Sequence, residues 1–289
     1  MQSVRVLVLG QGFVGEYLAS LLRMHSVSYA ATTTDGRNGT IAWRLPADAN
    51  TPADFSLLPV ASTVVVTFPL PGCPAARRLL DGYIDHAQRV CADHPRLRWI
   101  YLGSSRGFKE VPSTRFTKPD VSAGGPRVEA EECVIAEYAG HVLNLVGLWG
   151  GARQPESWAR FYTSPERLRS RLNDRSLHLI HGADSARAIY AVAMCTAELP
   201  AGRWLVSDER VYDTLQNIIG DPRIRRFLVE LLQEAEVQEL LGVECVDDIR
   251  LGASEVTKRI DSSHFWRQFG IQPLYPFVCG QPDPADKTA

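Results

Sequence analysis

In the first half of the chain, short apolar runs alternate with segments in which apolar residues recur at helical spacing. Short apolar runs bounded by Gly, Pro or polar turns predict strands at 4–9, 27–34, 63–68, 97–102 and 141–146. Apolar residues at helical spacing predict helices between them at 14–24, 75–92 and 126–138. Because strands and helices that alternate in this way form α/β folds, we expect a doubly wound parallel sheet with right-handed crossovers.

The pattern changes after Gly147 to a mixture of shorter elements. Amphipathic or apolar segments occur at 158–172, 177–180, 184–197, 204–207 and 222–241. We therefore predict a sheet domain over 1–147 and a smaller mixed α/β lobe over 148–289, with about 177–200 returning to the sheet. The last ten or so residues are expected to be disordered.

Composition excludes several classes of function. The chain has 289 residues, of which 45% are hydrophobic and 22% charged, as in ordinary globular proteins. Lys and Arg number 31 against 33 Asp and Glu, so the net charge of -2 offers no basic field for nucleic acid. No apolar run approaches the ~20 residues of a membrane span, and the start lacks a signal-peptide pattern. We expect a cytoplasmic monomer or homodimer that acts on a small-molecule substrate, with no nucleic-acid or membrane partner.

The cysteines are scattered along the sequence. They form no CxxC pair and have no histidine spacing suited to zinc, so we expect no metal site. The pattern is typical of reduced, mostly buried thiols in a cytoplasmic protein. The six residues are Cys73, Cys91, Cys133, Cys195, Cys245 and Cys279.

The clearest chemical signal lies between the first predicted strand and the first predicted helix. Gly10, Gly12 and Gly15 fit the pattern GxGxxG in the strand–turn–helix context that the motif requires. In a Rossmann-type domain these glycines allow a tight turn, close approach of a pyrophosphate, and close helix–strand packing. The helix N-terminus also offers free N–H groups to the phosphates. The predicted dinucleotide site comprises Gly10, Gln11, Gly12, Phe13, Val14 and Gly15, and the alternative is a glycine-rich turn without a ligand.

The end of the second predicted strand bears on the choice of cofactor. NAD sites place an acidic residue here, ~20 positions after the glycines, to bind the ribose 2′-hydroxyl. Asp35 has this separation, whereas Thr33, Thr34 and Arg37 could hold the 2′-phosphate of NADP. We predict NADP and leave NAD as the alternative. Residues after the later strands complete the predicted cofactor site: Thr67, Phe68, Pro69 and Ser104.

Further segments of the chain share motifs with one enzyme superfamily. They lie at 101–105, 145–150, 180–189, 204–208 and 275–276, and 180–189 (Ile-His-Gly-Ala-Asp-Ser-Ala-Arg-Ala-Ile) is the most specific. These segments resemble the extended and atypical short-chain dehydrogenase/reductases, which include NAD-dependent sugar epimerases and dehydratases. The resemblance implies a Rossmann sheet with a C-terminal substrate lobe and NAD(P)-dependent oxidoreductase activity on a small organic substrate.

The sequence departs from that superfamily at its proton-transfer motif. Active members carry Tyr-x-x-x-Lys, in which the lysine lowers the tyrosine pKa. The resemblance places Ala123 at the tyrosine position and Arg127 at the lysine position, while Ser105 matches the superfamily's serine and Lys109 stands where a tyrosine often follows. The candidate catalytic residues are therefore Ser105, Lys109 and Arg127. Arg127 cannot act as an acid or base near neutral pH, but it could bind a ribose or carboxylate, or simply pair with Glu131.

The missing tyrosine leaves more than one function open. We expect an NAD(P)-dependent oxidoreductase in which the cofactor supplies the hydride. The alternatives are a non-catalytic NAD(P)-sensing module and a non-redox isomerase or lyase on the same scaffold. His181 is expected to close a structural hydrogen-bond network rather than to take part in chemistry.

Overall fold

The computed structural model describes residues 3–92 and 97–285 and confirms the predicted α/β architecture. Within those ranges one seven-stranded parallel sheet has the order β10-β6-β5-β4-β1-β2-β3, which is that of a doubly wound Rossmann fold. Its strands are β1 (Val4–Leu9), β2 (Tyr29–Thr33), β3 (Ile41–Ala42), β4 (Ala61–Val66), β5 (Arg98–Ser104), β6 (His141–Leu145) and β10 (Gly202–Val206).

All five strands expected in the first half of the chain are present; β1 has the predicted bounds, and the ends of the other four are shifted. The strand predicted at 63–68 is β4, which ends at Val66, so Thr67 and Phe68 follow the strand. The sequence analysis did not find β3, because two residues are too few for a period-2 pattern to be recognised.

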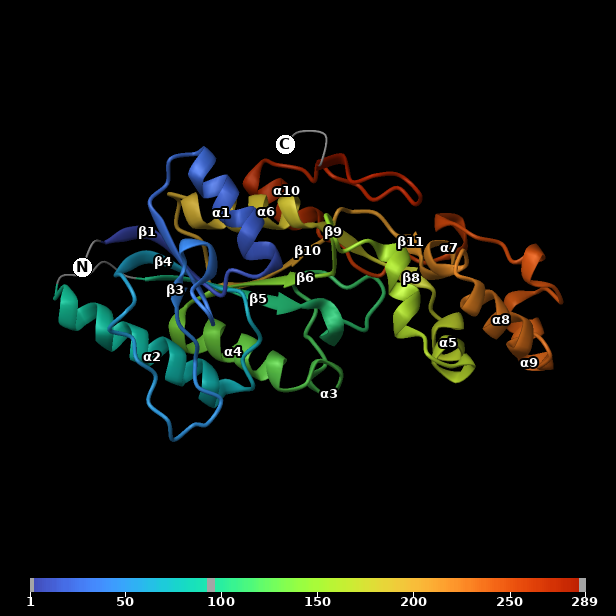
Figure 1. Ribbon diagram of the computed structural model, residues 1–289, viewed down its shortest axis with the longest axis horizontal. Coiled ribbons are helices and arrows are strands. Elements are labelled where there is room, and N and C mark those ends of the chain that lie inside the picture. Colours follow the sequence, from blue (N-terminus) through green and yellow to red (C-terminus); the bar gives the residue numbers. More distant parts are fainter. Residues whose placement is uncertain (1–2, 93–96, 286–289) are drawn as a thin grey trace.

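Helices cover both faces of the sheet (Figure 1). One face carries α1 (Phe13–Met24), α6 (Gly182–Met194) and α10 (Ser263–Phe269), and the other carries α2 (Cys73–Val90) and α4 (Pro126–Tyr138). Val6 and Val8 of β1 belong to the first apolar layer, whereas Leu7 and Leu9 belong to the second. Burial on both faces explains the unbroken apolar runs of the strands. No helix in the described ranges is long and apolar enough to cross a bilayer.

A smaller lobe extends beyond the sheet (Figure 1). Its elements, with two short strand pairs, are β7 (Gly147–Trp149), α5 (Pro165–Leu172), β8 (Ser176–Leu177), β9 (Leu179–His181), β11 (Tyr212–Asp213), α7 (Thr214–Ile218), α8 (Pro222–Leu231) and α9 (Ala235–Leu241). The segment at 222–241 forms two helices, because the chain turns between α8 and α9. Asp221 caps α8 ahead of Pro222, the usual start of a helix. Beyond residue 147, α6 and β10 still belong to the sheet layers. The domain boundary at 147 stays a prediction.

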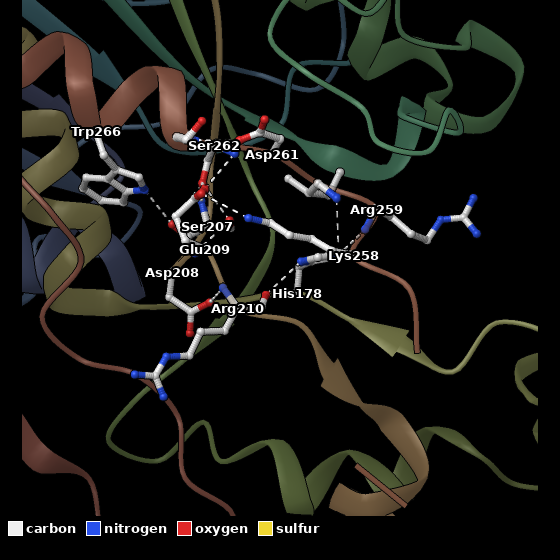
Figure 2. Close-up of polar contacts among 12 residues, drawn as sticks. His178, Ser207, Asp208, Glu209, Arg210, Lys258, Arg259, Asp261, Ser262 and Trp266 are labelled. Atoms are coloured by element: carbon white, nitrogen blue, oxygen red, sulfur yellow. Dashed lines mark hydrogen bonds and ion pairs between the residues drawn. The ribbon is translucent and has the colours of Figure 1, made fainter. Parts of the chain in front are cut away.

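A buried polar network joins the end of β10 to the chain that returns from the lobe (Figure 2). Ser207 Oγ lies 2.7 Å from Ser262 Oγ. Glu209 accepts hydrogen bonds from the Ser262 backbone N–H at 2.8 Å and from Lys258 Nζ at 3.1 Å. His178 Nε2 accepts a backbone N–H of the same returning segment at 3.0 Å. These bonds tie the lobe to the edge of the sheet at β10.

The C-terminal segment is anchored by a buried carboxylate. His181 Nε2 donates to Asp283 Oδ2 at 3.0 Å, and its Nδ1 accepts the Ala183 N–H at 3.1 Å. The Gly151 N–H also donates to Asp283, at 2.6 Å. The hydrogen-bond network expected for His181 is thus present, and the expected disorder of the tail is wrong at Asp283. Residues 286–289 of that tail lie outside the described residues.

The cysteines differ from expectation in their burial. Among the six, which all lie in the described ranges and are free, only Cys133 is buried. Cys73 and Cys195 are half-buried, and the other three are exposed. A thiol is small enough to lie at a surface without cost, so composition alone does not decide its burial.

Candidate functional site

The carboxyl ends of the parallel strands surround a cavity of about 450 Å³, a typical size for a ligand site. It is lined by these residues that the sequence predicted: Gly10, Gln11, Gly12, Phe13, Val14, Thr33, Thr34, Arg37, Thr67, Phe68, Pro69, Ser104 and Arg127. It is also lined by residues that sequence reasoning missed: Leu102, Gly103, Leu145, Val146, Leu148 and Arg153. Residues from distant parts of the chain thus meet at the edge where ligands bind in doubly wound sheets.

The glycine turn has the close packing that its motif predicts. Gly10 has a φ of +93°, and a Cβ there would come within 2.8 Å of Thr67 Oγ1. A Cβ on Gly15 would lie 3.1 Å from the Gly10 carbonyl oxygen, so this glycine packs the helix on the turn and does not line the cavity. The Gly10 N–H donates to Thr32 Oγ1 at 2.9 Å and fixes the turn against β2.

The second glycine of the motif faces open space. Gly12 is the N-cap residue of α1, no side chain caps this helix, and nothing lies within 4 Å of a Cβ built on Gly12. The N–H groups of the first helical turn have no side-chain cap and are therefore available to an anion. A dinucleotide pyrophosphate fits this cradle.

An ion pair lies at the end of β2, beside the cavity. Arg37 Nη1 lies 3.1 Å from Asp35 Oδ1, with both side chains at least half exposed. A hydrogen bond from the Thr33 side chain, and then Arg37, hold the pKa of Asp35 below its usual value. Arg37 lines the cavity and Asp35 does not.

Arg127 is held at the end of β5. Its Nη2 donates to the carbonyl oxygens of Leu102 at 2.6 Å and Gly103 at 3.3 Å, while its buried Nε has no partner among the described residues. The alternative pairing with Glu131 is wrong, because Glu131 accepts from the Ser104 N–H at 3.0 Å and from other buried donors. Arg127 thus contributes a fixed positive charge to the cavity lining.

Ala123 does not share a helix with Arg127. It lies in α3 (Val121–Gly124). Gly125, with a φ of +64°, ends this helix, and Pro126 begins α4. The four-residue spacing of Tyr-x-x-x-Lys depends on one continuous helix, on which such residues are neighbours. Ala123 and Arg127 therefore do not lie on one helix face, and their placement on that motif stays a prediction.

Ser105 and Lys109 lie outside the residues that line the cavity. Ser105 begins a 3₁₀ turn and its carbonyl accepts the Phe108 N–H at 3.0 Å. Lys109 is exposed, and its carbonyl accepts from Arg259 Nη2 at 3.0 Å. The structure does not bring these two candidates to Arg127 in the cavity, and their catalytic roles stay predictions.

Arg153 is the most informative residue that the sequence analysis missed. Its guanidinium carbon lies 4.4 Å from the centre of the Phe13 ring, directly beside the glycine turn. Reciprocal backbone hydrogen bonds with Gly150, of 2.9 and 3.1 Å, turn the loop after β7 back toward the sheet. No sequence motif predicts that this arginine lies beside the glycine turn, because its position depends on the path of a loop.

The charges around the cavity have one sign. The charged residues that line it are Arg37, Arg127 and Arg153, and no Asp or Glu is among the described lining residues. A concave site with only positive charge favours an anionic ligand. Together with the free helix N-terminus, this charge suits the pyrophosphate of a dinucleotide.

Comparison with known proteins identifies solved structures with the same fold. No family model and no curated protein matches the sequence. Among solved structures, a protein named as an NAD-dependent epimerase/dehydratase from Methylobacillus flagellatus matches with a TM-score of 0.60 and 16% identity, over 96% of this chain and 95% of that one. A short-chain dehydrogenase/reductase superfamily protein from Agrobacterium tumefaciens with bound NAD matches with a TM-score of 0.60 and 13% identity, over 94% and 93%. The chain therefore has the fold of the epimerase/dehydratase and short-chain dehydrogenase/reductase structures.

A structure with the other nicotinamide cofactor is also similar. Yeast methylglyoxal/isovaleraldehyde reductase Gre2, complexed with NADPH, matches with a TM-score of 0.53 and 16% identity over 93% of each chain. Proteins of this fold thus carry NAD in one case and NADPH in another. The fold alone does not choose between the two cofactors.

Proposed function

We propose that this protein binds NAD(P) in the cavity at the carboxyl edge of the sheet and acts as an oxidoreductase on a small organic substrate. The observation that carries this proposal is the cavity itself, where an open glycine turn meets three arginines and no acidic side chain. The NAD- and NADPH-bound structures of the same fold support it.

The residues of the chain have separate tasks in this proposal. The first turn of α1, open at Gly12, binds the pyrophosphate, and Arg153 adds a positive charge beside it. Thr33, Thr34 and Arg37 surround the adenosine ribose. The nicotinamide, when bound, supplies or accepts the hydride.

The proton that accompanies the hydride has no obvious donor in the cavity. The titratable lining residues are arginines, which do not exchange protons near neutral pH. The hydroxyl of Ser104, which also lines the cavity, can donate a hydrogen bond to a substrate oxygen, and water then supplies the proton. General acid catalysis typically contributes ~10²–10⁴-fold, so turnover is expected to be slow.

The same observation favours a second candidate, a non-catalytic NAD(P)-sensing module. Such a protein needs the glycine turn and the arginines but no proton donor. Oxidation of bound NADPH by a panel of aldehydes and ketones separates the two. Turnover above that of the Gly12→Asp variant supports the oxidoreductase, and tight binding without turnover supports the sensor.

Cofactor preference provides the direct test of the adenosine end. We expect the full-length protein to bind NADPH somewhat more tightly than NADH in isothermal titration, because Arg37 lines the cavity and Asp35 does not. Arg37→Gln should weaken NADPH binding about tenfold, the size of one charge-assisted hydrogen bond, and leave NADH binding nearly unchanged.

Asp35→Asn is the matched change on the other member of the ion pair. It frees Arg37 and removes a negative charge, so it should strengthen the preference for NADPH. A wild-type preference for NADH of about tenfold or more would instead make Asp35 the ribose ligand. Failure of both cofactors to bind would exclude the proposed function.

Arg153 should contribute to the binding of both cofactors alike. We expect Arg153→Gln to weaken NADH and NADPH about tenfold, because one charged contact with the pyrophosphate is lost. Arg160→Gln is the matched control, since Arg160 stacks on Phe161 at 4.9 Å in the same part of the chain but does not line the cavity. Equal affinities of the two variants would remove Arg153 from the site.

A further inference from the structure

Metal-ligating side chains meet on the helical layer that carries α2 and α4, apart from the cofactor cavity. The Sγ atoms of Cys73 and Cys133 and a carboxylate oxygen of Glu137 all lie within 4.8 Å of one another. Cys133 and Glu137 are one helical turn apart on α4, and Cys73 is the first residue of α2. The two helices lie side by side on one face of the sheet (Figure 1).

We propose that Cys73, Cys133 and Glu137 form a binding site for one thiophilic divalent cation such as Zn²⁺. Thiolate sulfur and carboxylate oxygen are standard zinc ligands, and three protein ligands with water in the fourth position are an established arrangement. Cys73 is half-buried and the Glu137 side chain is 38% exposed, so an ion and its water can reach the cluster.

The distances within the cluster suit tetrahedral coordination. Cys73 Sγ lies 3.6 Å from Glu137 Oε1. With Zn–S near 2.3 Å and Zn–O near 2.0 Å, a tetrahedral site separates sulfur from oxygen by about 3.5 Å. The buried Cys133 Sγ lies 3.7 Å from the Cys73 carbonyl oxygen, so it already points at the first residue of α2. Binding therefore requires only small side-chain movements.

The charges around the cluster also balance. Two thiolates and one carboxylate carry three negative charges, against two positive charges on the ion. The remaining negative charge is matched by Arg77, whose Nε and Nη2 donate to the Glu137 carboxylate at 2.7 and 2.6 Å. Hydrogen bonds of this kind orient a ligating carboxylate, and such outer partners commonly support metal affinity.

The position of the cluster connects it to the cofactor cavity. Pro69, which lines the cavity, precedes Cys73 by four residues, and Arg127 lies on α4 ahead of Cys133. An ion that joins α2 to α4 would hold the elements behind two walls of the cavity together. Because the site exists in the folded chain, the bound ion should also stabilise the fold.

Cadmium is the first probe, because its thiolate complexes absorb in the ultraviolet. The full-length protein is reduced, freed of metal with a chelator and titrated with Cd²⁺, then with Zn²⁺ in competition. We expect a charge-transfer band that saturates at one ion per chain and is displaced by Zn²⁺. The melting temperature should rise with Zn²⁺. This readout is independent of cofactor binding.

Matched variants separate the site from general thiol binding. Cys73→Ser should weaken Zn²⁺ binding more than about 100-fold, beyond the 10–100-fold typical of an outer-shell partner. Cys195→Ser, at the other half-buried cysteine, should bind as the wild type does. Glu137→Gln tests the third ligand on an exposed position, where folding is not at risk, and should weaken binding while the thiolate band remains.

Three results would overturn the proposal. One is equal Zn²⁺ affinity of the Cys73→Ser and Cys195→Ser proteins. Another is unchanged affinity of Glu137→Gln, which would remove the carboxylate from the site. The third is absence of Cd²⁺ or Zn²⁺ uptake by the reduced protein.

Discussion

Gly12→Asp is expected to abolish binding of both NADH and NADPH while the protein remains folded. A side chain at this position projects into open space before the first turn of α1, where the pyrophosphate is proposed to bind. Two unit charges about 4 Å apart repel by about 4 kcal/mol at an effective dielectric constant of about 20, which is a loss of roughly 1000-fold in affinity. Isothermal titration with each cofactor measures this loss.

The fold itself should tolerate this change. Gly12 has a φ of -91° and no side-chain cap, and Asp is a preferred N-cap residue, so urea unfolding should show equal or slightly higher stability. Gly220→Asp is the matched control, because Gly220 is exposed and also has no atom within 4 Å of its Cβ position. Wild-type affinity in the Gly12→Asp protein would show that the dinucleotide binds elsewhere.

Arg203→Met is expected to cause the largest loss of stability, about 3–5 kcal/mol, because it leaves a buried charge without its partner. The Glu131 side chain is fully buried, and Arg203 Nη1 lies 3.0 Å from its Oε2. The same carboxylate accepts Asn144 Nδ2 at 2.7 Å and the Ser104 N–H at 3.0 Å. The network thus joins α4, β5, β6 and β10 directly beneath the cavity.

Urea unfolding at neutral pH measures this loss against two controls. Arg225→Met breaks an exposed pair with Asp247 and should cost no more than about 1 kcal/mol. Adding Glu131→Gln to Arg203→Met removes the unpaired charge and should recover most of the stability. Equal stability of the Arg203→Met and Arg225→Met proteins would show that the buried charge needs no partner.

The fold was predictable from the sequence because its signals are local. Strands covered on both faces appear as unbroken apolar runs, and β1 and β4 were found in this way. The interruption between α3 and α4 is also marked locally, by Gly125 and Pro126. The placement of Ala123 and Arg127 on one helical motif did not take this signal into account. The apolar pattern does not mark the division of 222–241 into two helices, because both halves keep an apolar face.

Most of the cavity lining was predictable for the same reason. The glycine turn lies within six residues, and the other predicted lining residues follow strand ends, which parallel topology brings to one edge. The remaining features depend on contacts between segments far apart in the chain. Arg153 reaches Phe13 through the path of a loop, and Arg127 bonds to strand carbonyls instead of Glu131.

The sequence by itself therefore determined the parallel α/β sheet, the glycine turn and the strand ends that line the cavity, since these follow from periodicity and from residues close in the chain. Only the tertiary structure decided the charge of the cavity and the meeting of Cys73 with Cys133, which are 60 residues apart. The physical reason is that a side chain's partners are set by the packing of whole helices and loops, and neighbouring residues in the sequence carry no record of it.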